Sequence, residues 1–223
     1  MDTPKFYAVI VAGGSGTRMQ TITPKQFLLL NGMPVLMHTI LKFANNKYKP
    51  KIILVLAPEH IAIWANLVEH FCFKIEITVV SGGKERFHSV KNSLPFIAEN
   101  AIVAIHDAVR PLLSDNLISS CYQIALEKNN AICAVPSKDS VRILDNELGS
   151  KMLPRHQVFL IQTPQVFNST QLKKAYAQNY QPDFTDDASV VQYAGFTINL
   201  IAGEANNIKI THPIDLQIAE IVL

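Results

Sequence analysis

Short apolar segments that alternate with helical segments constrain the fold of this chain more than any other feature. Residues 6–12 are rich in β-branched side chains, and further apolar runs occur at 51–57, 75–80, 101–105 and 131–136. Apolar runs without polar alternation are typical of strands that are buried on both faces of a parallel sheet. The sequence therefore predicts an α/β fold in which helices flank a mostly parallel sheet.

The expected helices share apolar positions three or four residues apart. They span residues 34–45, 60–71, 86–97, 116–128, 169–180, 186–194 and 213–222. We expect Thr185 to cap the helix that begins at residue 186. Short strands are expected at 197–201 and 208–211. Because the sequence has no internal repeat and no linker, residues 1–223 are predicted to form a single domain.

Residues 137–158 interrupt this pattern. An exposed strand is expected at 137–144, a turn at 145–149 and a returning strand at 150–156. The segment has too few apolar residues to bury itself, so we expect a β-hairpin arm that projects from the sheet. An isolated two-stranded arm is marginally stable in water. A second subunit would stabilise it, and we therefore expect a homodimer formed through the arm.

A glycine-rich loop follows the first strand. Gly13, Gly14 and Gly16 allow backbone N–H groups to approach an anion closely, and Arg18 and Lys25 add positive charge beside them. This combination suits a polyphosphate such as a nucleoside triphosphate. The loop lacks the Gly-Lys-Ser/Thr of a P-loop. The alternative interpretation is a tight turn beside two solvated cations.

Two further polar segments also follow expected strands. The turn at 81–86 could present its backbone to a base, with Ser89 facing the nucleotide, although an ordinary turn and helix start explain it equally well. In the segment 106–111, Asp107 suits Mg²⁺, which prefers hard oxygen ligands; the alternative is an ion pair with Arg110. Ligands of parallel sheets bind at the carboxyl ends of strands, so these segments are expected to converge on one crevice.

Three more positions are ambiguous from spacing alone. Arg155 lies on the expected return strand of the arm, where an arginine is usually a solvated charge. The segment 185–187 could be a plain helix cap with acidic residues in the first turn. Lys209 lies within a short apolar strand, where a lysine needs an anionic partner or a route to solvent.

Composition excludes several classes of partner. The formal net charge of +2 provides no bulk attraction to nucleic acid or membranes. No apolar run reaches the roughly 18–20 residues that span a bilayer, and the N-terminus resembles no signal peptide. The cysteines are interpreted as reduced core residues at positions 72, 121 and 133. We therefore expect a cytoplasmic protein that binds small molecules.

Taken together, the motifs resemble a known family. The segments 12–19 and 24–27 are similar to the signature of sugar-phosphate nucleotidylyltransferases. Five further segments narrow the resemblance to the cytidylyltransferases of 2-C-methyl-D-erythritol 4-phosphate: 82–86, 106–111, 163–165, 185–189 and 207–209. The resemblance extends from about residue 6 to residue 221. It implies a Rossmann-like sheet of the nucleotide-diphospho-sugar transferase type.

The resemblance also implies a reaction of the non-mevalonate isoprenoid pathway. CMP would pass from CTP to 2-C-methyl-D-erythritol 4-phosphate with Mg²⁺, giving 4-diphosphocytidyl-2-C-methyl-D-erythritol and pyrophosphate. The implied nucleotide-binding residues are Ala12, Gly13, Gly14, Gly83, Lys84 and Ser89. The implied catalytic cations are Arg18, Lys25 and Lys209. The acceptor would be bound by Asp107, Arg110, Ser140, Arg155, Thr185 and Lys209, with Asp107 also the metal ligand.

The resemblance also implies that the arm exchanges between subunits. Ser140 and Arg155 would then bind the acceptor in the active site of the neighbouring subunit. Two positions depart from the family pattern. Asn206 stands where an aspartate is common, which leaves Asp107 as the expected metal ligand, and Ser140 replaces a common threonine but keeps the hydroxyl.

Two alternative functions remain at this point. A ribitol-5-phosphate cytidylyltransferase shares most of the motifs and the reaction type, and the segment 185–189 favours methylerythritol phosphate over it. A catalytically silent nucleotide-binding module is the other alternative. The presence of Arg18, Lys25 and Asp107 argues against that module.

Overall fold

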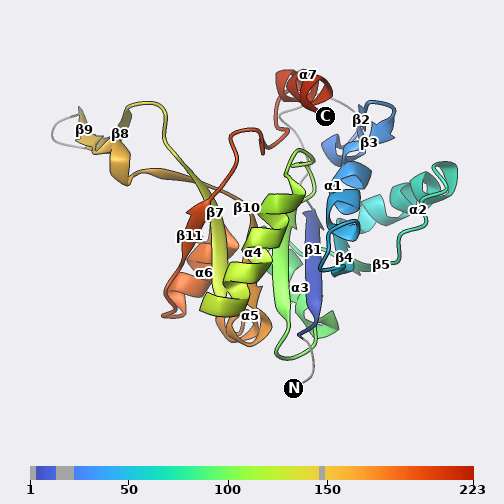
Figure 1. The fold of residues 1–223 in the computed structure, drawn as a ribbon, viewed down its shortest axis with the longest axis horizontal. Coiled ribbons are helices and arrows are strands. Elements are labelled where there is room, and N and C mark those ends of the chain that lie inside the picture. Colours follow the sequence, from blue (N-terminus) through green and yellow to red (C-terminus); the bar gives the residue numbers. More distant parts are fainter. Residues whose placement is uncertain (1–3, 14–22, 146–148) are drawn as a thin grey trace.

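The central element of the fold is a seven-stranded sheet with the order β11-β7-β10-β6-β1-β4-β5 (Figure 1). The computed structural model describes residues 4–13, 23–145 and 149–223, so Gly14, Gly16 and Arg18 lie outside the described residues. The strands of this sheet are β1 (Phe6–Ala12), β4 (Lys51–Leu56), β5 (Ile77–Ser81), β6 (Ile102–Asp107), β7 (Asn130–Pro136), β10 (Phe159–Asn168) and β11 (Leu200–Ala202). Only β10 runs antiparallel to its neighbours, which confirms the mostly parallel sheet.

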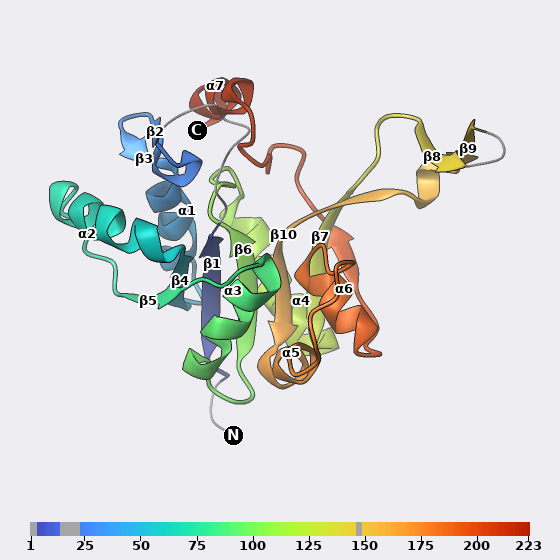
Figure 2. The same cartoon turned by 180° about the vertical axis from the view of Figure 1, so that it is seen from behind.

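Helices cover both faces of the sheet. They are α1 (Val35–Ala44), α2 (Ile61–His70), α3 (Arg86–Ser93), α4 (Asp115–Lys128), α5 (Ser169–Tyr176), α6 (Asp187–Tyr193) and α7 (Pro213–Val222). Successive residues of β1 point to opposite faces, as the period of a strand requires. Ile10 therefore packs with α1 and α4 on the face seen in Figure 1, and Val9 packs with α3, α5 and α6 on the face seen in Figure 2.

Short elements complete the described fold. The strands β2 (Leu29–Leu30) and β3 (Met33–Pro34) pair with each other beside α7. Single 3₁₀ turns lie at Lys25–Phe27, Pro58–His60, Leu94–Phe96 and Arg155–Gln157. Arg155 therefore lies in a turn and not on a return strand as expected. None of the helices in the described ranges is long and apolar enough to cross a membrane.

Strand β10 was not expected from the sequence. Its polar residues and Pro164 mask the strand pattern, because proline is disfavoured inside a central strand. The structure accommodates Pro164 at an irregularity, where the register with β7 shifts between Ile161 and Gln165 and the Thr163–Pro164 peptide bond is cis. The strand lies between β6 and β7, and its irregular segment reaches the carboxyl end of β6.

Three local expectations near the C-terminus are wrong. Residues 208–211 form no strand. The segment is fixed by an isolated backbone hydrogen bond, from Ile210 N to Val109 O at 2.9 Å, and not by the ladder of a sheet. Asp186 and not Thr185 caps α6, because Asp186 and Ser189 form a reciprocal capping box. Helix α5 ends at Tyr176, four residues earlier than expected.

The expected arm is present. Strands β8 (Val141–Asp145) and β9 (Gly149–Leu153) pair only with each other, and the hairpin projects away from the sheet in both views (Figures 1 and 2). Its apolar side chains Ile143, Leu144 and Met152 are exposed, with Leu144 at 89%. The described residues of the hairpin strands thus contribute nothing to the core of their own chain.

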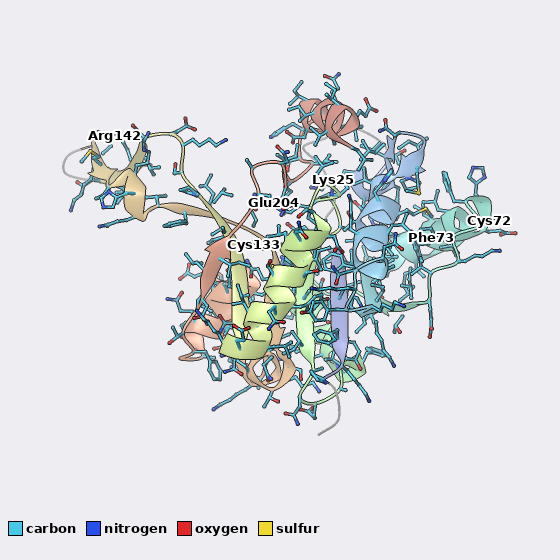
Figure 3. The ribbon with its side chains drawn as sticks, viewed as in Figure 1. Lys25, Cys72, Phe73, Cys133, Arg142 and Glu204 are labelled. Carbon is cyan, nitrogen blue, oxygen red and sulfur yellow. The ribbon has the colours of Figure 1, made fainter. Side chains whose placement is uncertain are left out.

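The cysteines differ from one another. Cys121 and Cys133 are buried, as expected, and their sulfur atoms lie 3.2 Å apart between α4 and β7. Cys72 is exposed next to Phe73, just beyond α2 (Figure 3), so its assignment to the core was wrong.

Candidate functional site

The carboxyl ends of β1, β5 and β6 converge on a cavity of about 430 Å³. Its lining includes residues from all three polar segments that were expected to converge, together with the end of β1 and Lys209. The lining residues are Val11, Ala12, Gly13, Lys25, Gln26, Gly83, Lys84, Glu85, Arg86, Ser89, Asp107, Ala108, Val109 and Lys209. The predicted convergence of these segments on one crevice is confirmed for the described residues.

Close packing against His88 and Ser89 explains the glycines of the turn after β5. The Ser89 hydroxyl accepts a hydrogen bond from Gly83 N at 3.1 Å. A Cβ atom at Gly83 would lie 2.4 Å from the Cβ of His88, and one at Gly82 would lie 3.1 Å from the Ser89 hydroxyl. The contact at Gly83 excludes a side chain and the one at Gly82 is tight, so Gly83 lines the cavity with its backbone alone.

Lys25 reaches the cavity from a separate segment. The Lys25–Phe27 turn is anchored by buried Gln26, whose side-chain amide donates to Ala12 O at 3.2 Å and contacts His60 Nδ1 at 3.2 Å. The Lys25 ammonium donates to Ile210 O at 3.3 Å. Figure 3 shows Lys25 above the strand ends. A cation therefore lies beside the end of β1, as the sequence predicts.

Asp107 is surrounded by three cations. Its carboxylate lies 2.9 Å from Lys209 Nζ, 3.4 Å from Arg110 Nε and 3.8 Å from Arg86 Nε. Burial by itself would raise the pKa of Asp107, but Lys209, Arg86 and Arg110 outweigh burial and hold the pKa well below its usual range. The ion pair with Arg110, which was the alternative interpretation of Asp107, is present, and Lys209 has the anionic partner that its position requires.

A second cavity of about 280 Å³ adjoins the first. It is lined by Arg86, Asp107, Arg110, Ile161, Gln162, Thr163, Gln165, Thr185, Asp186 and Lys209. Arg86, Asp107 and Lys209 line both cavities. Two ligands, one in each cavity, would therefore meet at this charged junction.

The position of the junction is set by strand β10 and the loop after β11. The Thr163 hydroxyl accepts a hydrogen bond from Asp107 N at 3.1 Å, and Arg110 Nη1 donates to Asn207 O at 2.8 Å. Buried Asn207 in turn donates to Thr163 O at 2.8 Å. Sequence motifs included these residues, but only the fold shows that they support Asp107 and Arg110.

Sequence reasoning missed a role for Arg86 and Asp187. Arg86 begins α3, and its guanidinium lies 2.6 Å from the buried carboxylate of Asp187, at the start of α6. Burial by itself would lower the pKa of Arg86, but Asp187 and Asp107 outweigh burial and raise the pKa. The only sequence signals were an arginine after a glycine turn and a second acid after the helix cap.

Two predicted acceptor residues lie outside both cavities. Ser140 and Arg155 are exposed at the base of the arm, and Arg155 Nη1 donates to Lys138 O at 3.1 Å. Figure 3 shows Arg142 of the arm well away from Lys25. Within one chain, the structure does not bring these residues to the site.

The site offers limited ligands for a metal ion. The described residues contain no cluster of three or more His, Cys, Asp and Glu side chains that could hold one. Asp107 is an ionised carboxylate that lines both cavities, and one such carboxylate suits Mg²⁺ that takes its remaining ligands from substrate phosphates. Asn206 is exposed and lines neither cavity.

Comparison with known proteins decides the family. The family model of 2-C-methyl-D-erythritol 4-phosphate cytidylyltransferase matches residues 6–223. The chain belongs to this family. A relative of that name from Phocaeicola vulgatus is 44% identical over 217 residues, which are 97% of this chain and 99% of the relative. The relative of that name from Bacteroides thetaiotaomicron is also 44% identical, over 98% of this chain and all of its own.

Solved structures agree with this assignment. The 4-diphosphocytidyl-2C-methyl-D-erythritol synthase of Anaerococcus prevotii superposes with a TM-score of 0.82 at 29% identity, covering 98% of this chain and 95% of its own. The 2-C-methyl-D-erythritol 4-phosphate cytidylyltransferase of Francisella tularensis gives 0.81 at 31% identity, covering 98% and 100%. The nucleotidyltransferase fold is thereby confirmed, and the ribitol phosphate alternative is not favoured.

Proposed function

We propose that this member of the family transfers CMP from CTP to 2-C-methyl-D-erythritol 4-phosphate and releases pyrophosphate. The observation that carries the proposal is the junction of the two cavities at Arg86, Asp107 and Lys209. The larger cavity is assigned to CTP and the smaller one to the acceptor. CTP and the acceptor would then meet at a cluster of cations that neutralises the triphosphate of CTP and the phosphate of the acceptor.

Backbone and polar groups of the larger cavity suit the nucleotide. Ala12, Gly13 and Gly14 are assigned to the triphosphate, on the motif and on the position of the first two at the end of β1. Gly83, Lys84 and Ser89 are assigned to the cytosine and ribose side, because the turn exposes its backbone to the cavity.

The acceptor phosphate oxygen attacks the α-phosphorus of CTP in the proposed step, and the bond to the pyrophosphate oxygen breaks. No covalent enzyme intermediate forms. Arg18, Lys25 and Lys209 stabilise the negative charge that develops on the α-phosphate and on the leaving pyrophosphate. Asp107 orients Lys209 and Arg110 through the ion pairs described above. Catalysis thus depends on positioning and charge stabilisation.

We assign Mg²⁺ as the cofactor and Asp107 as its protein ligand. The ion would supply further neutralisation of the phosphates. The carboxylate of Asp107 lines both cavities, which supports this assignment because the phosphates of both substrates would lie there. With Asn206 in place of a common aspartate, Asp107 is the one carboxylate assigned to the metal.

We further propose that residues 1–223 act as one domain that forms a homodimer through the arm at 137–158. The exposed apolar side chains of the arm support this proposal, because isolated two-stranded hairpins are marginally stable. Ser140 and Arg155 would then bind the acceptor in the neighbouring subunit, while Arg110 and Thr185 bind it from their own chain.

Pyrophosphate release tests the proposed reaction. The protein is assayed with CTP and Mg²⁺ and with either 2-C-methyl-D-erythritol 4-phosphate or ribitol 5-phosphate. We expect turnover with the first acceptor. Faster turnover of ribitol 5-phosphate would reassign the substrate. Tight CTP binding without pyrophosphate release from either acceptor would instead identify a silent nucleotide-binding module.

A further inference from the structure

We propose that Asp187 is a positioning residue of the transfer reaction and that it acts through Arg86. Asp187, oriented by Tyr176, would hold the Arg86 guanidinium at the junction of the two cavities, where Arg86 contacts a substrate phosphate. The inference rests on the proposed function, because it assigns Arg86 to the phosphates of that reaction.

The first observation is the geometry around Arg86. Its Nη2 lies 2.6 Å from Asp187 Oδ2, whereas its Nε lies 3.8 Å from Asp107 Oδ1. Asp187 is therefore the main anchor. Among the described residues, none accepts a hydrogen bond from Nη1 of Arg86. The N–H groups of Nη1 can therefore bind a ligand. Arg86 lines both cavities, and a guanidinium suits bidentate binding of phosphate.

The second observation is the burial of Asp187. Its side chain is 0% exposed and has two partners among the described residues, Arg86 and the Tyr176 hydroxyl, which donates to Oδ1 at 2.6 Å. A buried ion pair is weak evidence for stability, because desolvation offsets much of the attraction. Burial, followed by the charge of Asp187, raises the pKa of Tyr176, so the hydroxyl keeps the proton that it donates.

The third observation is the support of the helix that carries Asp187. The Gln165 side chain of β10 accepts a hydrogen bond from Ala188 N at 2.8 Å and donates to Asp186 at 2.8 Å. Helix α6 is thereby fixed to the strand that also supports Asp107 through Thr163. The arrangement fixes the two carboxylates that flank Arg86 to the same strand.

A double-mutant cycle on kcat/KM tests the proposal. We expect Arg86→Ala to lower kcat/KM by about 100-fold, as loss of one preorganised charged donor does. Asp187→Asn keeps the shape of the side chain, and we expect a loss of about tenfold or more. If Asp187 acts through Arg86, the double variant is no worse than Arg86→Ala. Losses that multiply would show an independent structural role and overturn the proposal.

Chemical rescue provides a second readout. Millimolar guanidinium chloride is expected to restore part of the activity of Arg86→Ala, because Asp187 can hold the added cation. The same addition should not restore the double variant. Sodium chloride at equal concentration is the control. Equal rescue of both variants would contradict a positioning role for Asp187.

A matched tyrosine pair covers the case in which Asp187→Asn does not fold. Tyr176→Phe removes the hydroxyl on Asp187, and Tyr122→Phe removes an equally buried hydroxyl that donates to Tyr7 O at 2.9 Å, away from both cavities. We expect Tyr176→Phe to lower kcat severalfold and Tyr122→Phe to leave it unchanged. Equal kcat values for the two folded variants would overturn the proposal. Absence of turnover in the wild type would refute the proposed function instead.

Discussion

The cation-lined junction and the β8–β9 arm differ in how many of their side chains find partners within the same chain. At the junction, Asp107 has partners from α3, from the end of β6 and from the loop after β11. On the arm, the described contacts of Arg155 stay local, and Leu144 is 89% exposed. The residues of the proposed phosphate site are thus held together within one chain, whereas the described apolar side chains of the arm face solvent, as expected if a second subunit covers them under the proposed homodimer.

Removal of an assigned catalytic cation should have the largest effect. Lys25→Ala is expected to fold normally and to lose at least about 100-fold in kcat, or about 3 kcal/mol of transition-state stabilisation. Arg18→Ala is expected to behave similarly. Steady-state kinetics and a thermal melt measure the two properties separately. Near wild-type kcat in either variant would remove its catalytic assignment.

Subunit complementation tests whether the arm serves a neighbour. In a purified heterodimer of Lys25→Ala and Arg155→Ala chains, one site combines an intact cavity with an intact arm. If the arm exchanges, this heterodimer should recover about half of the wild-type activity, whereas each homodimer is impaired.

The control heterodimer combines Lys25→Ala with Lys209→Ala. Both defects then lie in cavity residues, so neither site is intact and no recovery is expected. The single variants must first be shown to be impaired. If the Lys25→Ala/Arg155→Ala heterodimer then recovers no activity, whether or not the control heterodimer does, the arm does not complete a neighbouring site.

The buried histidine beside the junction should make stability depend on pH. Burial lowers the pKa of His106 from 6.5 to about 4, although Nε2 contacts Arg110 O at 3.1 Å. As the pH falls, the unfolded chain therefore binds the proton first. The free energy of unfolding is therefore unaffected by titration of His106 above pH 6.5. It decreases by about 3 kcal/mol in total as the pH falls to about 4.

Urea denaturation across this pH range measures the dependence. His106→Gln, which cannot titrate, should lose less free energy of unfolding than the wild type between pH 6.5 and 4.5. Asp107 does not interfere, because its lowered pKa keeps it ionised in this range. An identical pH dependence in the two proteins would show that His106 does not titrate as described.

The sequence predicted most of the sheet and the cavity because both depend on local patterns. Apolar runs mark β1, β4, β6 and β7, and the polar segments that follow strands are brought together by parallel topology. Strand β10 was missed because Pro164 and the polar residues around it conceal a buried strand. No local pattern shows that this strand lies next to β6.

Contacts between distant segments account for the other differences. Arg86 and Asp187 are 101 positions apart, so only the fold reveals their ion pair. The apolar residues at 208–211 resemble a strand, but they lie beside the loop after β6 and are fixed there by single hydrogen bonds, as at Ile210. Burial alone does not distinguish such a segment from a strand.

The smallest predicted effects come from one substitution made in both regions. Ser89 is buried, and its hydroxyl lies within contact distance of the glycine turn, so the extra methyl of Ser89→Thr would overpack the cavity. Overpacking costs about 1–3 kcal/mol. A cost near the lower end of that range, about 1.4 kcal/mol, would lower kcat/KM for CTP about tenfold if the strain falls on nucleotide binding. Ser140 is exposed at the base of the arm, and Ser140→Thr keeps its hydroxyl.

We therefore expect Ser140→Thr to change kcat/KM by less than about twofold for either substrate. Titration of CTP and of the acceptor separates the two variants, since only Ser89→Thr should raise KM for CTP. A similar loss in both variants would mean that the arm is as tightly packed in the working enzyme as the cavity. That result would replace the contrast between the two regions with a single continuous site.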